Sequence, residues 1–216
     1  MDSVGLIVGL GNPGPEYERT RHNFGCLVVD EILAAAANRK SMHLEVLQRE
    51  GDFQLWRCVI GGASCLVCKP MTFMNLSGKA VARVCGKHGV VSPKDVLVLH
   101  DELDLPMGRM RLKRGGGSNG HKGIDSIAEH LGSAEFLRLR LGIGRPEHSS
   151  QVVRWVLEPF TDQDMPGVVE VCAASFKGIG LLMRRGLSES TQFLNSFSWS
   201  APTPAASEID TTKGME

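Results

Sequence analysis

Val4-Gly5-Leu6-Ile7-Val8-Gly9-Leu10-Gly11-Asn12-Pro13-Gly14 stands near the start of the chain and joins an apolar run to a G-x-G-x-x-G turn. The apolar run, residues 4–9, predicts a buried strand. Glycines at this spacing after a strand are typical of dinucleotide-binding turns, in which backbone N–H groups and a helix N-terminus meet a pyrophosphate. The stretch therefore predicts an α/β fold and raises the question of which ligand the turn serves.

The residues after the turn argue against a dinucleotide. Pro13 removes one N–H donor, and the polar residues 15–21 delay helical periodicity by about ten residues. A ribose-binding acid should end a second strand, but Asp30 and Glu31 fall inside the first predicted helix. We interpret the turn as one that carries Asn12 to the carboxyl edge of the sheet, where α/β proteins bind ligands. No nicotinamide, flavin or other cofactor is expected.

The rest of the chain alternates strands and helices. Asn23 is the expected N-cap of the first helix, and Thr161 with Asp164 forms a capping box for the last, which Gly186 ends. Further strands are predicted at 53–60, 63–68, 95–99, 109–114 and 138–143, and helices at 24–38, 77–88, from about 121, and 161–185. This alternation predicts a single α/β domain, a twisted mixed and mostly parallel sheet flanked by helices.

Composition and length agree with one domain. The chain has 216 residues, 42% of them hydrophobic, and a formal net charge of zero. The domain is expected over 1–198, and the Pro-, Ala-, Ser- and Thr-rich stretch 199–216 is expected to be a disordered tail. Without an uninterrupted apolar run long enough for a bilayer, or the pattern of a leader peptide, we expect a soluble cytoplasmic protein that binds no membrane.

Neither the cysteines nor the overall charge identifies a site. The six cysteines lie mostly in apolar segments, and the C-x-x-C at 65–68 lacks the second pair that a structural zinc site requires. We therefore expect no metal. Between Arg109 and Arg145 the chain carries eight basic and three acidic residues. This excess leaves two interpretations open, a solvated face or a surface that contacts phosphates.

A second glycine motif, Gly116-Gly117-Ser118-Asn119-Gly120, matches the G-x-S-x-G turn of serine esterases. His121 and two further histidines follow it, so Ser118 is an alternative nucleophile. The preceding segment, however, alternates basic and apolar residues, unlike the central buried strand that such a turn follows. A flexible turn that admits another backbone is the favoured interpretation.

A histidine and an aspartate follow different predicted elements but converge on the same sheet edge. His22 stands just before a predicted helix, whose dipole disfavours the protonated ring and so favours a general base. Asp101, at the end of a neighbouring strand, is placed to accept a hydrogen bond from that ring. Side-chain amides of Asn12 and Asn75 are available to hold water or an oxyanion. Because His100 and Glu102 face away from Asp101, a three-ligand metal cluster there is unfavourable.

Six stretches occur in one order: G9-L10-G11-N12-P13-G14-P15-E16-Y17, T20-R21-H22-N23, F73-M74-N75-L76-S77-G78-K79-A80-V81, H100-D101-E102-L103-D104-L105-P106, G115-G116-G117 through G120-H121, and R138-L139-R140-L141-G142-I143-G144. In this order and spacing they resemble the bacterial-type peptidyl-tRNA hydrolases, from about Val4 to Phe197. The resemblance implies a usually monomeric enzyme, without metal or cofactor, that cleaves the ester between a peptide and the 3′ ribose of tRNA. Its partners are the tRNA acceptor stem and the attached peptide.

The resemblance also implies roles for individual residues. His22 would activate water, Asp101 would support it, and Asn12 would separate blocked from free aminoacyl esters. Positions that line the cleft for the acceptor end and the peptide are Tyr17, Phe73 and Asn75.

Three basic residues complete the candidate site. Lys113, with arginines nearby, is the candidate clamp for the acceptor-stem backbone. Arg140 is either part of that clamp or an ion-pair anchor of the fold. Lys122 stands where the family usually has Asn, and we hypothesise that it reaches a phosphate or the oxyanion. A serine esterase that uses Ser118 and a non-catalytic RNA-binding module remain the alternative functions.

Overall fold

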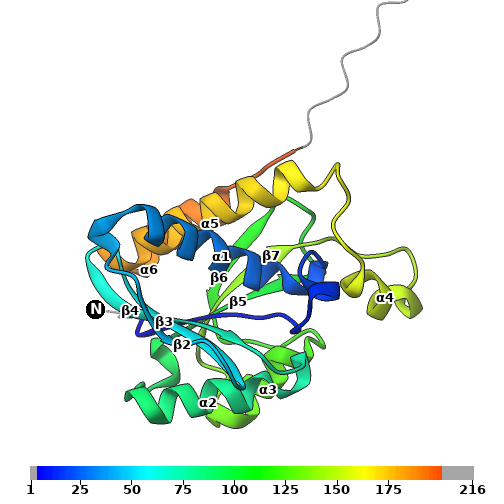
Figure 1. Ribbon diagram of the computed structural model, residues 1–216. Helices are drawn as coiled ribbons and strands as arrows, with labels where there is room; N and C mark the ends of the chain where they lie inside the picture. Colours follow the sequence, from blue (N-terminus) through cyan, green and yellow to red (C-terminus); the bar gives the residue numbers. More distant parts are fainter. Residues whose placement is uncertain (1–3, 201–216) are drawn as a thin grey trace, which may run out of the picture.

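The computed structural model describes residues 4–200, which form a seven-stranded sheet between two layers of helices (Figure 1). Its strands lie in the order β2-β3-β4-β1-β5-β7-β6. They are β1 (Leu6–Gly9), β2 (Glu45–Gln48), β3 (Phe53–Ile60), β4 (Ala63–Pro70), β5 (Val96–Glu102), β6 (Met110–Arg114) and β7 (Leu137–Gly142).

The pairing of the strands confirms the predicted mixed sheet. The four central strands, β4, β1, β5 and β7, run parallel to one another. Both edges are antiparallel: β3 and β2 extend one, and β6 closes the other. The two-residue connection Gly61–Gly62 enforces the antiparallel pairing of β3 and β4, because only a hairpin joins strands by so short a turn.

Helices cover both faces of the sheet (Figure 1). One face packs against α1, α5 and α6, and the other against α2 and α3, so that the core consists of one apolar cluster on each side. The helices are α1 (Phe24–Asn38), α2 (Ser77–His88), α3 (Lys122–Leu131), α4 (Val152–Leu157), α5 (Met165–Arg185) and α6 (Leu187–Ser196). Short 3-10 turns are η1 (Pro15–Tyr17), η2 (Arg21–Asn23), η3 (Lys40–Met42), η4 (Met74–Leu76), η5 (Pro93–Asp95) and η6 (Ser149–Gln151).

Close backbone contacts place the start of α1 against the carboxyl ends of the central strands. A Cβ atom at Gly25 would lie only 2.1 Å from the carbonyl oxygen of Leu99, and one at Gly9 only 2.5 Å from that of Gly25. Glycine at both positions therefore lets α1 lie directly on β1 and β5. Gly9 at the end of β1 and Gly25 in α1 thus serve the packing of helix on sheet, and residues 15–23 connect the turn to α1, as the sequence indicated.

Three elements were missed from the sequence, and the bounds of others differ from the predicted ones. The sequence pattern did not predict β2, α4 or α6, and it ended β4 at residue 68, whereas the strand continues to Pro70. The last long helix begins at Met165 rather than directly after Thr161. The predicted reciprocal bonds do form, because the Asp164 N–H donates to Thr161 Oγ1 at 3.2 Å and the Thr161 N–H donates to Asp164 Oδ2 at 3.0 Å.

Within the described residues, α5 is long and apolar enough to cross a membrane by length and composition, with a mean hydropathy of 1.4 in its most apolar window. More than half of that window is buried in the fold, as in the core helix of a soluble protein. At the end of the described chain, Trp199 donates its backbone N–H to the Gly108 carbonyl. The remainder of the predicted tail, 201–216, lies outside the described residues.

Candidate active site

A cleft of about 550 Å³ opens at the carboxyl ends of β1 and β5. Its walls come from the loop after β1, from η2 and η4, from the end of β5, from the glycine-rich turn before α3, and from α4. The cleft brings together seven of the nine predicted site residues: Asn12, Tyr17, His22, Phe73, Asn75, Asp101 and Lys122. Lys113 and Arg140 do not line it.

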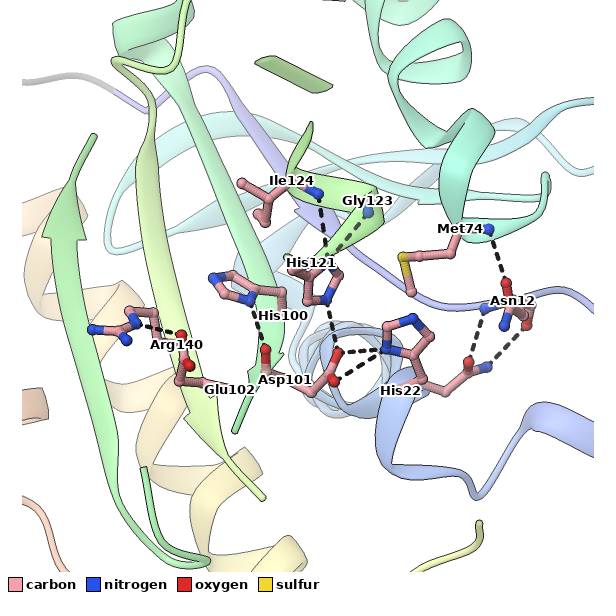
Figure 2. A network of polar contacts seen from close by, with 11 residues as sticks. Asn12, His22, Met74, His100, Asp101, Glu102, His121, Gly123, Ile124 and Arg140 are labelled. Atoms are coloured by element: carbon pink, nitrogen blue, oxygen red, sulfur yellow. Dashed lines mark hydrogen bonds and ion pairs between the residues drawn. The ribbon is translucent and has the colours of Figure 1, made fainter. Parts of the chain in front are cut away.

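His22 is bound to Asp101 across the cleft floor (Figure 2). Its Nδ1 lies 3.0 Å from Asp101 Oδ1 and 3.1 Å from Oδ2. An ionised carboxylate only accepts hydrogen bonds, so Nδ1 carries the hydrogen and donates. The lone pair of the neutral ring is then on Nε2, for which the described residues supply no hydrogen-bond partner. This tautomer is the one that a general base requires.

His121 is a third member of this polar group, and the sequence pattern did not assign it to the site. Its Nε2 lies 2.9 Å from Asp101 Oδ1, and its Nδ1 accepts the backbone N–H groups of Gly123 at 3.2 Å and Ile124 at 3.4 Å. It is therefore the N-cap of α3. Because Nδ1 accepts, the single hydrogen of the neutral ring is on Nε2 and is donated to Asp101. A histidine directly before a predicted helix and after a glycine turn was the signal in the sequence.

The carboxylate of Asp101 is buried and charged at the same time. Burial by itself would raise the pKa of Asp101, but the positive ends of His22 and His121, with the hydrogen bonds they donate, hold that pKa well below its usual range. The side chain is thus a stable anion between two imidazole rings, and it favours a positive charge on either of them.

The same three residues have the spacing of a metal-binding group, with ligand atoms within 4.8 Å of one another. The hydrogen-bond pattern does not suit a cation. His121 Nδ1 accepts from two N–H groups, so a metal on Nε2 would require that ring to lose its last proton. The arrangement suits proton transfer better than metal binding, and the absence of a metal from the chemistry stays a prediction.

His100 lies behind this group in β5, on the face of the strand opposite Asp101, as alternation predicted. Its ring meets that of His121 edge-on, with centroids 4.9 Å apart, and its Nδ1 donates to the carbonyl of Asp101 at 2.7 Å. Burial, reinforced by His121, lowers the pKa of His100 to about 3. This ring is therefore an uncharged packing partner of His121.

The side chain of Asn12 is held in one orientation. Its Oδ1 accepts the backbone N–H of Met74 at 2.8 Å, so the amide NH₂ group is the part left for a ligand. Asn23 fixes the backbone beside it: its Oδ1 accepts the Asn12 N–H at 2.8 Å, and its Nδ2 donates to the Asn12 carbonyl at 2.9 Å. Asn23 is the N-cap residue of α1, as predicted, but its side chain makes no capping hydrogen bond, because these bonds to Asn12 replace it.

Ser118 lines the cleft, but no histidine side chain of the described residues is hydrogen-bonded to its hydroxyl. Its Oγ accepts the N–H of Gly120 at 3.2 Å. The nearest histidine in the sequence, His121, has both ring nitrogens occupied, by Asp101 and by the start of α3. The geometry gives no support to a serine nucleophile.

The basic side chains occupy two places. Lys122 is exposed at the first turn of α3 and lines the cleft. Arg140 donates from Nε to Glu102 Oε2 at 2.7 Å, and both side chains are largely buried. Lys113 lies on β6 next to this pair, and burial together with the charges of Arg140 and Arg138 lowers its pKa. The ion-pair interpretation of Arg140 agrees with this contact, while tRNA binding by Arg140 and Lys113 remains a prediction.

Comparisons with known proteins identify the family. The family model "Peptidyl-tRNA hydrolase" matches residues 6–202. A peptidyl-tRNA hydrolase from Maridesulfovibrio salexigens is 52% identical over 197 residues, which cover 91% of this chain and 96% of the relative. One from Aquifex aeolicus is 41% identical over 186 residues, covering 84% and 89%.

The solved structure of the peptidyl-tRNA hydrolase from Acinetobacter baumannii has the same fold, with a TM-score of 0.83 at 31% identity. The match covers 92% of this chain and 97% of that one. Together with the match to the family model and the relatives, this likeness shows that the chain belongs to the peptidyl-tRNA hydrolase family.

Proposed function

We propose that this chain cleaves the ester of peptidyl-tRNA with a water molecule that His22 activates. Nε2 of His22 takes a proton from the water as it attacks the ester carbonyl. The ring then carries a positive charge, which Asp101 stabilises through the bond to Nδ1. The same ring can return the proton to the 3′ oxygen of the ribose as it leaves. The observation that carries the proposal is the 3.0 Å contact between His22 and Asp101 on the floor of the cleft.

Asn12 supplies the donor that this reaction needs on the acyl side. Since its Oδ1 is taken by Met74, its NH₂ group can only donate, and carbonyl oxygens of the substrate are its natural partners. A blocked amino group brings a further carbonyl, whereas a free ammonium is itself a donor. This difference accounts for a preference for peptidyl over free aminoacyl esters. Asn75, exposed at the start of η4, adds a second amide to the cleft.

The remaining predicted residues suit the peptide and the acceptor end of the tRNA. Phe73, which is 59% exposed, and Tyr17, which is partly buried, both line the cleft and offer aromatic surface to an unstacked base or an apolar side chain. Lys122 lines the cleft, and Lys113 and Arg140 lie outside its lining; their positive charge suits contacts to phosphates. We further propose that the protein acts as a soluble cytoplasmic monomer on the acceptor stem and its peptide.

The decisive assay is turnover of a blocked aminoacyl-tRNA by the wild type and by His22→Ala. We expect a fall in kcat of at least about 10²-fold, the usual contribution of a general base, with tRNA affinity largely kept. His43→Ala is the matched control, because His43 is exposed and does not line the cleft. Full activity of His22→Ala would contradict the mechanism, and labelling of Ser118 by a fluorophosphonate would favour the serine esterase instead. Binding of tRNA without any turnover by the wild type would indicate a non-catalytic RNA-binding module.

Lys122 has its own test. If its ammonium reaches a phosphate or the developing oxyanion, Lys122→Asn should weaken tRNA binding or lower turnover, and Lys122→Arg should keep most of both. Unchanged affinity and unchanged turnover in Lys122→Asn would remove this role.

A further inference from the structure

The helix α4 forms one wall of the cleft, yet little in α4 itself holds it there. It has six residues, fewer than an isolated helix needs to be stable in water. None of its side chains is fully buried, and Val153 is 68% exposed. The wall that α4 presents to the cleft is apolar and consists of Val152, Val153, Val156 and Leu157. Contacts from outside α4 must therefore keep this wall in place.

Arg21 provides those contacts at the C-terminal end of α4. Its Nη1 donates to the carbonyls of Trp155 and Glu158, each at 3.4 Å, and its backbone N–H donates to the Glu158 carbonyl at 3.1 Å. The last carbonyls of a helix lack partners within it, and a cation there also complements the helix dipole. Arg21 thus caps α4 from a segment more than 130 residues away in the sequence.

The guanidinium is built into this position. Its Cζ lies 3.8 Å from the centroid of the Trp155 ring, and the carboxylates of Glu158 and Asp164 lie 3.8 and 3.5 Å from its terminal nitrogens. Only 4% of Arg21 is exposed. Trp155 in turn donates from Nε1 to the Gly144 carbonyl at 3.1 Å. A planar cation between an aromatic ring and two carboxylates holds α4 in one position relative to η2.

Arg21 directly precedes His22 in η2. We propose that Arg21 is a positioning residue that fixes α4, the apolar wall, to the segment that carries the base, and that through α4 it sets affinity for the acyl part of the substrate. This inference rests on the proposed function of His22. According to this inference, α4 contacts the side chain of the amino acid whose ester is cleaved, because the apolar wall lines the same cleft as His22 and Asp101.

A wall that binds the acyl side chain in the ground state and in the transition state alike affects KM rather than kcat. Arg21→Met should therefore raise KM for N-acetyl-phenylalanyl-tRNA by about tenfold while kcat changes little. For N-acetyl-glycyl-tRNA, which offers no side chain to the wall, KM should stay close to the wild-type value. Arg21→Lys keeps the charge but not the planar fork, and should restore only part of the difference.

The order of α4 can be read separately. Arg154 lies within α4 with an 85% exposed side chain, so trypsin should cleave after it faster in Arg21→Met than in the wild type. Arg185→Met, which breaks an exposed pair with Glu189 elsewhere, is the matched control and should leave both KM values and this cleavage unchanged. Trp155→Leu approaches the same contact from α4, leaves η2 intact, and should reproduce the substrate-selective rise in KM.

The outcomes separate the two proposals. Equal loss of kcat on both substrates in Arg21→Met, with KM unchanged, would mean that Arg21 orients His22 and would overturn the role of α4. Unchanged kinetics in both Arg21→Met and Trp155→Leu would do the same. Should Arg21→Met fail to fold, Trp155→Leu still decides. Failure of the proposed function has a different signature, which is full turnover by His22→Ala.

Discussion

Asp101 joins His22 to His121: one of its oxygens, Oδ1, lies 3.0 Å from Nδ1 of the first ring and 2.9 Å from Nε2 of the second. Asp101→Asn keeps the shape but removes the charge that stabilises a protonated His22. We expect kcat on a blocked aminoacyl-tRNA to fall by at least about 10²-fold at neutral pH, with KM nearly unchanged. Single-turnover kinetics with saturating enzyme measures this directly. Asp30→Asn, which alters an exposed carboxylate paired with Lys69, should be fully active, and comparable rates in both variants would contradict the role of Asp101.

The two bonds of His121 can be separated by substitution. Asn is a good N-cap, so His121→Asn should keep the start of α3 satisfied while losing the bond to Asp101. We expect its melting temperature to stay close to that of the wild type and kcat to fall by about tenfold. His121→Ala loses the cap as well and should cost about 1 kcal/mol of stability in addition. If His121→Asn were as active as the wild type, His121 would be only a helix cap.

His100 predicts a specific dependence of stability on pH. Its pKa is lowered from an ordinary 6.5 to about 3 in the folded protein, chiefly by burial. Between these values the unfolded chain binds a proton that the folded chain does not, so the free energy of unfolding should decrease as pH falls, by up to about 1.4 kcal/mol per pH unit. Denaturant unfolding from pH 7 to 4 measures this slope.

In that experiment His100→Gln should flatten the slope, and His43→Gln, at an exposed site, should not. Asp101 and Glu102 act at lower pH, because their lowered pKa values mean that their stabilisation is lost only as pH falls below the ordinary carboxyl range. An identical slope in His100→Gln and the wild type would contradict the assignment to His100.

The sequence predicted those features that depend on local pattern. The apolar runs gave the parallel centre of the sheet, and alternation placed His100 and Glu102 on one face and Asp101 on the other. By contrast, β2 lies at the edge with no buried residue, and α4 buries none of its side chains, so neither has a strong hydrophobic period. Such elements are held by contacts from distant segments, as Arg21 holds α4.

The part of the site that lies at the ends of predicted strands and helices could be predicted from the sequence. His22 and Asp101 follow different elements that meet at one sheet edge, and this was enough to pair them. The second ring, His121, could not be assigned, because its role depends on which nitrogen faces α3 and which faces Asp101. The position of Asn23 at the N-cap of α1 was predictable, but the partner of its side chain was not, because the amide bonds the backbone of Asn12 instead of the first N–H groups of the helix.

The pair of Glu102 and Arg140 should be important for stability. Burial would raise the pKa of Glu102, but the hydrogen bond from Arg140 and the N–H of Asp104 outweigh it and lower that pKa. Removing one partner leaves the other charge largely buried and unpaired. We therefore expect Glu102→Leu to cost about 3 kcal/mol and the double variant with Arg140→Leu to cost clearly less than the sum of the two single changes. Urea unfolding checks this, and strictly additive losses would rule out coupling.

Lys113 lies among other cationic side chains, an arrangement that costs stability unless an anion binds there. Lys113 is directly opposite Arg138 in the pairing of β6 with β7, and Arg111 is opposite Arg140. Like charges opposite one another repel, and among these four side chains only Arg140 has a carboxylate of the described residues, that of Glu102, in hydrogen-bond contact. A phosphate of the acceptor stem that contacts Lys113 would offset this repulsion. Lys113→Gln should therefore weaken tRNA binding and reduce the slope of log K against log salt concentration by about 0.7–0.9.

Lys113→Gln should leave the free energy of unfolding unchanged or raise it by a few tenths of a kcal/mol, because it removes one of two positive charges that face each other across the strands. Lys87→Gln, at an exposed lysine in the last turn of α2, is the matched control and should alter neither quantity. Titrations of tRNA at several salt concentrations measure the slope. A slope equal to that of the wild type would mean that Lys113 contacts no phosphate, and its position beside the Glu102–Arg140 pair would then serve the fold alone.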